Sequence, residues 1–291
     1  MTLSEAILAT LAYHDIFDYP LAMEEIHQYL IGKKTSQAQV VKTLKILKNS
    51  GQIGESQTYF FLKNRQKIVQ TRLTHRKYSQ VKHKKAAFYA NILKLIPSLN
   101  LVAISGALSM ENSHKNDDID LVLVTAPNAL WTTRFLASLL LLPFKRDRAG
   151  FKVSDRACLN LFIDQSNLKI LPQNLYTAHE ICQMKPLWDR NKTYSTFIKA
   201  NSWVKKFLPN WSSAVPMSHS RESGNPVLKQ ALVFSHLALV IENFLKNFQL
   251  WYMRGKITTE RIGNTQLFFH PQNTQEWVLK EYEKRLNKLK I

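Results

Sequence analysis

The chain has 291 residues, and its 40 Lys and Arg against 21 Asp and Glu give it a formal net charge of +19. This length predicts about two domains, and a hydrophobic content of 45% is enough to bury a core, which excludes a disordered polymer. Two cysteines and no C-x-x-C or H-E-x-x-H motif exclude a disulfide framework and indicate a cytoplasmic protein. The best candidate for a membrane span, residues 129–144, is interrupted by Arg134 and is too short, so no membrane role is expected.

Residues 1–65 are expected to form the first domain. The spacing of apolar residues predicts helices over 3–13, 22–30 and 36–50, followed by short strands around 52–56 and 58–62. Three helices and a hairpin resemble a winged helix-turn-helix. Its third helix offers Lys42, Lys45 and Lys48 to a DNA groove, but residues 1–55 hold 5 Lys and Arg against 6 Asp and Glu. A module that docks on a neighbouring domain or a second protomer is therefore the alternative.

Residues 66–98 are expected to form a connecting helix that carries a run of positive charge. No acid occurs between Glu55 and Glu111, and nine cations crowd one stretch of that interval: Lys63, Arg65, Lys67, Arg72, Arg76, Lys77, Lys82, Lys84 and Lys85. The run from Lys63 to Lys85 favours a nucleic-acid partner through phosphate neutralisation. A solvated helix that only keeps the protein soluble explains it equally well.

The segment 99–210 is expected to be an α/β unit. Short apolar strands are predicted at 101–104, 120–125 and 158–163, with a helix over 128–142 between the second and third. Residues 174–208 are predicted to be helical, with Trp188 and Trp203 as packing anchors. The fold class is therefore α+β or mixed α/β, with helices around a small mixed sheet.

The remaining sequence predicts two further segments. Residues 211–227 are polar and irregular and are expected to be an exposed insertion loop, in which 218–227 is similar to peptides translated from dispersed bacterial repeats. Residues 228–291 are expected to form a C-terminal helical region, with helices over 227–255 and 276–291.

The segment ISGALSMENSHKNDDIDLVLV, residues 104–124, carries the strongest functional signal. An apolar strand leads into a glycine turn at Gly106, and a polar loop leads into a second apolar strand that contains Asp118 and Asp120. Residues two apart in a strand face the same side, so the two carboxylates are expected to point together. They supply the hard oxygen ligands that Mg²⁺ prefers, and backbone N–H groups near Gly106 are placed to hold phosphate.

This pattern resembles the nucleotidyltransferase superfamily that includes DNA polymerase β and the minimal nucleotidyltransferases. The resemblance covers roughly residues 99–165. It implies that Asp118 and Asp120 bind Mg²⁺ or Mn²⁺, and that the turn of Ser105, Gly106, Ala107 and Ser109 binds a nucleoside triphosphate. It also implies transfer of a nucleoside monophosphate to an acceptor hydroxyl, with release of pyrophosphate.

Two positions depart from the family pattern. The usual Ser after the glycine is Ala107, although Ser105 and Ser109 flank the turn and either contact phosphate or cap the helix. The resemblance places Asn160 where a third carboxylate is usual, and an amide cannot accept a proton as a carboxylate does. Asp164 has the same strand parity, but it lies ~13 Å further along. His114 is a further candidate for a phosphate contact.

Two functions follow from these observations. The first is a Mg²⁺-dependent nucleotidyltransferase whose acceptor is a nucleic-acid end, a protein side chain or a small molecule. The second is a nucleic-acid-binding regulator in which a degenerate transferase domain senses nucleotide without catalysis, an interpretation that Ala107 and Asn160 favour.

Overall fold

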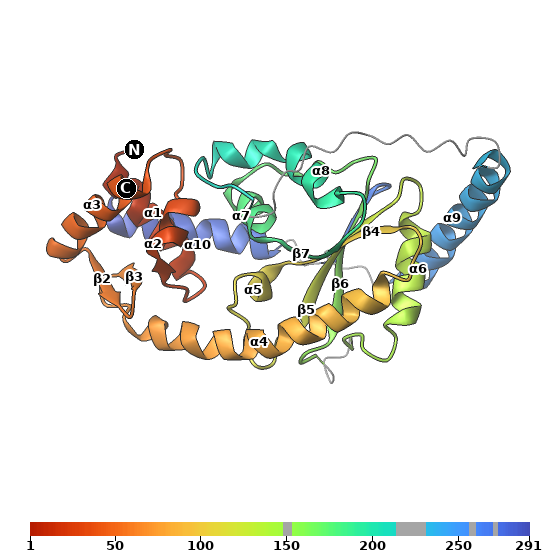
Figure 1. The fold of residues 1–291 in the computed structure, drawn as a ribbon, viewed down its shortest axis with the longest axis horizontal. Coiled ribbons are helices and arrows are strands. Elements are labelled where there is room, and N and C mark those ends of the chain that lie inside the picture. Colours follow the sequence, from red (N-terminus) through yellow and green to blue (C-terminus); the bar gives the residue numbers. More distant parts are fainter. Residues whose placement is uncertain (148–152, 214–230, 256–259, 270–272) are drawn as a thin grey trace.

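The computed structural model describes residues 1–147, 153–213, 231–255, 260–269 and 273–291. It contains helices arranged around a three-stranded sheet near the N-terminus and a six-stranded mixed sheet in the centre (Figure 1). The predicted α+β class is confirmed. No helix in these ranges has the length and apolar character needed to cross a membrane.

The first unit of the chain contains three helices and a small antiparallel sheet, ordered β1-β3-β2. Thr2 and Ser36 form capping boxes that start the first and third helices, and Gly51, with a φ of +69°, follows the end of the third. The predicted helices and hairpin are confirmed, while β1 was not predicted. The elements are α1 (Leu3–Asp15), β1 (Leu21–Ala22), α2 (Met23–Gln28), α3 (Gln37–Asn49), β2 (Ile53–Ser56) and β3 (Tyr59–Leu62).

The predicted connecting helix is α4 (Lys67–Leu93), which runs along one side of the molecule (Figure 1). Much of its charge is used inside the fold. Arg72 donates to both carboxylate oxygens of Glu25, and Arg76 pairs with Glu111. Lys82 is only 1% exposed and binds Asp155. The basic helix therefore ties the first unit and the loops of the central sheet together.

The central sheet has the strand order β7-β4-β5-β6-β9-β8, in which β5 and β6 are parallel and the other neighbours antiparallel. The three predicted strands are confirmed and lie together as β4, β5 and β6. Two segments differ from prediction: β7 interrupts 174–208, and the C-terminal region adds β8 and β9 to the sheet. The strands are β4 (Leu99–Ile104), β5 (Ile119–Thr125), β6 (Ala157–Asp164), β7 (Lys185–Asp189), β8 (Arg261–Ile262) and β9 (Gln266–Phe268).

Helices cover both faces of the central sheet. On one face α4 and α6 bury Val102, Leu121 and Phe162, and on the other α7, α8 and a 3-10 turn bury Ala103, Val122 and Ile163. Trp203 is buried on the second face, as predicted, and Trp188 is partly buried on the first. The elements are α5 (Gly106–Ser109), α6 (Leu130–Leu140), α7 (Leu175–Gln183), α8 (Thr193–Ala200) and the 3-10 turn η1 (Ser202–Lys206).

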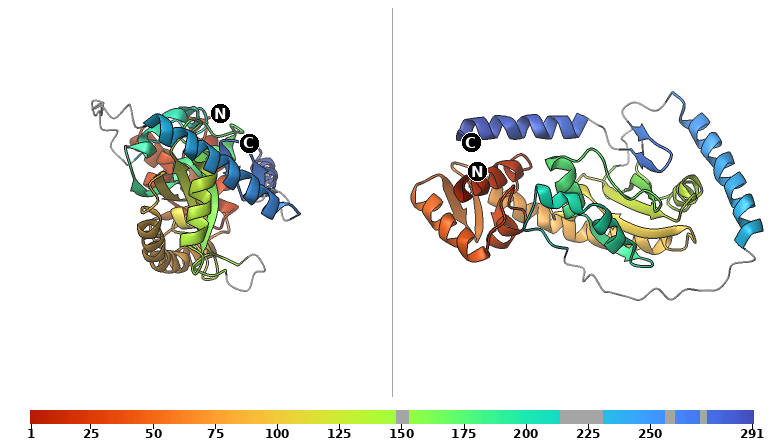
Figure 2. Two further views of the ribbon diagram at one scale, coloured as in Figure 1. Left: turned by 90° about the vertical axis from the view of Figure 1, so that its right-hand side faces the viewer. Right: turned by 90° about the horizontal axis from the view of Figure 1, so that it is seen from above.

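The last two helices reach opposite ends of the molecule (Figure 2). The helix α9 (Ala231–Met253) packs on α6, where Glu242 accepts hydrogen bonds from the backbone N–H groups of Trp131 and Thr132. The helix α10 (Asn273–Leu289) returns to α1, where Arg285 pairs with Asp15. Of the expected insertion loop, residues 214–227 lie outside the described part of the chain.

Candidate functional site

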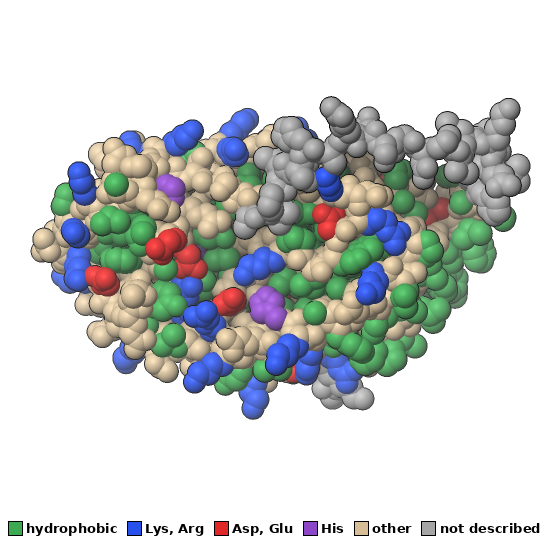
Figure 3. Space-filling view, in the orientation of Figure 1, with side chains coloured by type: hydrophobic (Ala, Val, Ile, Leu, Met, Phe, Trp, Pro, Cys, Tyr) green, Lys and Arg blue, Asp and Glu red, His purple; other side chains and the backbone are tan. Residues whose placement is uncertain are grey.

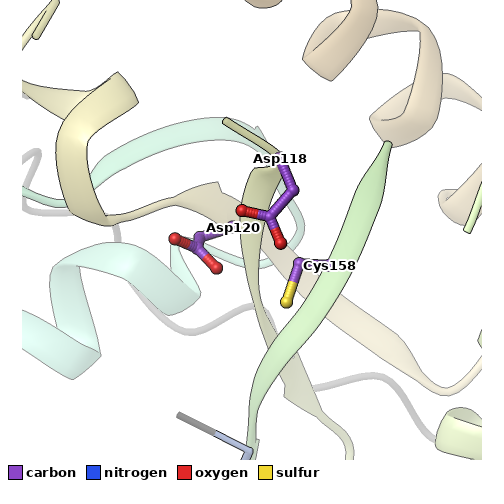
Figure 4. A group of neighbouring side chains, drawn as sticks. All are labelled: Asp118, Asp120 and Cys158. Carbon is purple, nitrogen blue, oxygen red and sulfur yellow. The ribbon is translucent and has the colours of Figure 1, made fainter. Parts of the chain in front are cut away.

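The two aspartates of the motif lie at the start of β5. Asp120 and Val122 alternate with buried Leu121, so Asp118 and Asp120 face the side of the sheet that α7 covers. Figure 4 shows both carboxylates directed into one space beside β6. The prediction that these two side chains point together is confirmed by their place in the cluster described next.

The third member of the cluster is Cys158. Its Cα is paired with that of Asp120 across β5 and β6, and ligand atoms of Asp118, Asp120 and Cys158 all lie within 4.8 Å of one another (Figure 4). The position after it is irregular: Leu121 pairs with Leu159 and Val122 with Leu161, so Asn160 is an extra residue at a β-bulge. Asn160 therefore has no paired position on β5, although it lines the same cavity as Asp120.

Gly106 closes the site from the end of β4. Its φ is +61°, and a Cβ built at this position would lie 2.9 Å from Oδ2 of Asp120. A side chain would therefore meet both an unfavourable backbone conformation and the carboxylate itself. This close approach between turn and carboxylate explains why position 106 is occupied by glycine.

A cation already faces the acidic pair, by which we mean Asp118 and Asp120. Nη1 of Arg146 lies 2.6 Å from Oδ2 of Asp118, and the adjacent charges of Asp118 and Asp120 raise the pKa of the guanidinium against the effect of its burial. Arg146 belongs to the basic segment after α6, which had no predicted role. Its guanidinium lies close enough to the acidic pair to neutralise a phosphate bound there.

The structure gives three of the candidate side chains partners away from the acidic pair. Ser109 is buried and its hydroxyl donates to the carbonyl oxygen of Gly106. Asp164 accepts from the backbone N–H groups of Asn128 and Ser166 at the far end of the strand. The ring of His114 packs on that of His75, 4.1 Å away, outside the cavity described below. Ser105, Gly106 and Ala107 do line that cavity.

A cavity of about 600 Å³ opens beside Asp120. Its volume lies in the range of sites for small molecules. Most of its lining is apolar or aromatic and comes from four parts of the chain that are distant in sequence. They include Tyr13 and Tyr19 from the first unit, Met110 after α5, Tyr176 and Glu180 from α7, Phe268 from β9 and Glu276 from α10. The first unit and the C-terminal helix therefore form walls of the same cavity.

Glu180 is the one acid of α7 and faces this cavity together with Asp120 and Asn160. Burial, followed by the negative charge of Asp120, raises the pKa of Glu180 from 4.5 to about 7. Near neutral pH the carboxyl therefore exists in both protonation states, as a group that exchanges protons requires. No local pattern in the sequence marks Glu180, because only the packing of α7 brings it to β5.

The donor set of the cluster fits a hard divalent cation. Burial and the charges of Asp120 and Asp118 raise the pKa of the Cys158 thiol well above its ordinary value, so the thiol stays protonated. A neutral thiol is a poor ligand for the softer zinc ion, which binds thiolates. Mg²⁺ is commonly bound by one or two carboxylates and completes its shell with substrate phosphates and water.

Comparison with protein-family models, with curated proteins and with solved structures finds no match to this chain.

Proposed function

We propose that this chain is a nucleotidyltransferase that uses Mg²⁺ or Mn²⁺ to move a nucleoside monophosphate from a nucleoside triphosphate to an acceptor. The observation that carries the proposal is the acidic pair facing the Gly106 turn, where the carboxylate of Asp120 occupies the room a side chain would need. This arrangement supports the family resemblance of residues 99–165 independently of the sequence spacing.

In this proposal Asp118 and Asp120 hold the metal and the turn of residues 105–107 lies beside the phosphates. A bound Mg²⁺ would orient the triphosphate and offset the charge that develops on it. Arg146, which pairs with Asp118, would be placed to contact a phosphate oxygen once a cation held that carboxylate. Ser109 has no part in phosphate binding, because its hydroxyl is committed to Gly106.

We assign Glu180 as the group that takes the acceptor proton. The acceptor oxygen bonds to the α-phosphorus, the bond from that phosphorus to pyrophosphate breaks, and the hydroxyl proton passes to the carboxylate of Glu180. A pKa near 7 suits this role, because the group is partly ionised at neutral pH and regains its ionised form after each transfer. Glu180 thereby replaces the base that neither Asn160 nor the protonated Cys158 supplies.

The cavity lining favours a small, largely apolar acceptor over a nucleic-acid end. Nucleic-acid sites combine aromatic platforms with a positively charged groove, whereas Arg261 is the one Lys or Arg among the described residues that line this cavity. The aromatic walls come partly from α1, which supports the interpretation of the first unit as a docking module.

The alternative of a non-catalytic nucleotide sensor is supported by one observation. The position opposite Asp120 holds Cys158 in place of a third carboxylate, so metal binding is expected to be weaker than with three acids. Such a domain would bind metal and triphosphate but release no pyrophosphate.

The test measures triphosphate binding by calorimetry with Mg²⁺ or Mn²⁺ and pyrophosphate release from the four ribonucleoside triphosphates. Asp118→Ala and Asp120→Ala are expected to abolish binding while circular dichroism and the melting temperature stay close to wild type. Asp117→Asn is the matched control, because Asp117 precedes the pair and its carboxylate accepts from the backbone N–H of His114. Unchanged affinity in both alanine variants would refute the assignment, and binding without pyrophosphate release would favour the sensor.

A further inference from the structure

The helix α9 carries a row of exposed apolar side chains. Seven large residues recur at spacings of one, three and four along the helix: Leu237, Val240, Ile241, Phe244, Phe248, Trp251 and Tyr252. Phe244 and Trp251 are each 67% exposed. We call this set the α9 stripe. Figure 3 shows apolar side chains gathered at the end of the molecule that α6 and α9 form.

The stripe is distinct from the face by which α9 packs on α6. Glu242, Gln249 and Met253 are buried, and Glu242 and Gln249 hydrogen-bond with Trp131 of α6. At 3.6 residues per turn this packed face lies roughly 140° around the helix from the centre of the stripe. The helix therefore has one apolar side exposed in addition to the side that attaches it to the domain.

The size of the stripe matches what an interface needs. Seven large side chains, each about half exposed and each offering roughly 200 Å² when fully exposed, present on the order of 800 Å². The largest apolar patch on a monomer is commonly ~300–600 Å², and a standard interface buries about 800 Å² per partner. Its area is sufficient for a stable dimer.

We propose that the α9 stripe is the interface between two copies of this chain. The stripe contains no Lys, Arg, Asp or Glu, so two copies can meet there without bringing like charges together despite a net charge of +19 each. A two-fold axis across the helix would pair each stripe with its equivalent, which is the commonest arrangement of homo-oligomers. This inference does not depend on the proposed enzymatic function.

The same composition argues against a membrane surface as the occupant. Helices that lie on membranes are rich in Lys and Arg along their polar side. Lys246 is the single Lys or Arg among the 23 residues of α9, and its ammonium group donates to Asn264. The polar side of α9 therefore lacks the row of Lys and Arg that would hold it to anionic lipid.

The experiment measures the mass of the full chain by light scattering after gel filtration and by sedimentation equilibrium. The wild type is expected to form a dimer of the 33.7 kDa chain at micromolar concentration. The double variant Phe244→Glu with Trp251→Glu is expected to raise the dissociation constant roughly 100-fold or more, since buried aromatic residues dominate interface energetics. Ile46→Glu, at an exposed apolar residue of α3, is the control that should remain dimeric.

A second variant guards against misfolding of the double variant. Both native cysteines are buried, so Phe248→Cys creates the one exposed thiol among the described residues, and mild oxidation should yield a disulfide-linked dimer. A monomeric wild type that gives no cross-linked product would overturn the proposal. So would a monomeric wild type that floats with vesicles of three parts phosphatidylcholine to one part phosphatidylglycerol, because the stripe would then bind lipid.

Discussion

Replacing Gly106 with alanine tests the contact on which the site depends. The new Cβ would lie 2.9 Å from Oδ2 of Asp120, whereas carbon and oxygen atoms rest at roughly 3.5 Å, so the carboxylate must move by roughly 0.6 Å. Metal and substrate sites tolerate about 0.5 Å. We therefore expect the affinity for triphosphate with Mg²⁺ to fall roughly 10- to 100-fold, the range seen when the group that orients a ligand is lost.

Gly51→Ala is the matched control for this substitution. Gly51 has a φ of +69°, close to the +61° of Gly106, but a Cβ there has nothing within 4 Å. Both variants should therefore lose about 1–2 kcal/mol of stability from the left-handed backbone, a decrease in melting temperature of roughly 2–8 °C. Calorimetric titration should separate them, because only Gly106→Ala displaces Asp120. Equal triphosphate affinity in the two variants would refute the idea that Gly106 positions the carboxylate.

Three further predictions concern Glu180, Lys82 and the basic run. The pKa of Glu180 is higher in the folded chain than its ordinary value of 4.5, so the free energy of unfolding should fall by at most about 3 kcal/mol as pH rises from about 4.5 to about 7. Urea titrations at several pH values measure this fall, and Glu180→Gln should remove it. A pH profile of the variant parallel to that of wild type would contradict the assignment. Lys82→Met should lower the free energy of unfolding by about 3 kcal/mol in urea titrations, because the ammonium group binds Asp155 and the carbonyl oxygens of Lys115 and Asp117. Lys84→Met, at an exposed position of the same helix, should change the free energy of unfolding by no more than about 0.5 kcal/mol. Similar losses in both variants would show that the buried ion pair does not contribute more to stability than a surface lysine. If the basic run binds nucleic acid, Lys77→Gln with Lys84→Gln should reduce the slope of log affinity against log salt concentration by about two for oligonucleotide binding, without loss of stability. A wild type that binds no oligonucleotide at low salt would leave the run with a structural role only.

The parts of the site that lie close in sequence were predictable. A glycine turn and two aspartates within one strand depend only on the two-residue period of a strand and on local backbone geometry. The place of Asn160 was not, because Cys158 pairs with Asp120 and a bulge after Leu159 leaves Asn160 without a paired position on β5. A bulge of this kind has no signature in a single sequence.

The fold shows the same division. The helix α3 was predicted closely from the period of its apolar residues, while β8 and β9, with two and three residues, carry no periodic signal. The strand β7 contains Pro186, which weakens a strand assignment from sequence, but β7 lies at the edge of the sheet, where a proline is tolerated. The charge of the basic run also misleads by itself, because its partners, such as Glu25 and Asp155, are remote in sequence.

The contact of α10 with α1 has a consequence for how the protein is made. Tyr13 and Glu276 line one cavity although 262 residues separate them in the chain. A ribosome adding ~5–20 residues per second needs roughly 13 to 50 seconds to synthesise that separation. During this interval the side of α1 that packs on α10 is exposed to solvent, and the cavity lacks a wall. The helix α10 completes the pocket, so a nascent chain can pair β4, β5 and β6 well before it can hold a ligand.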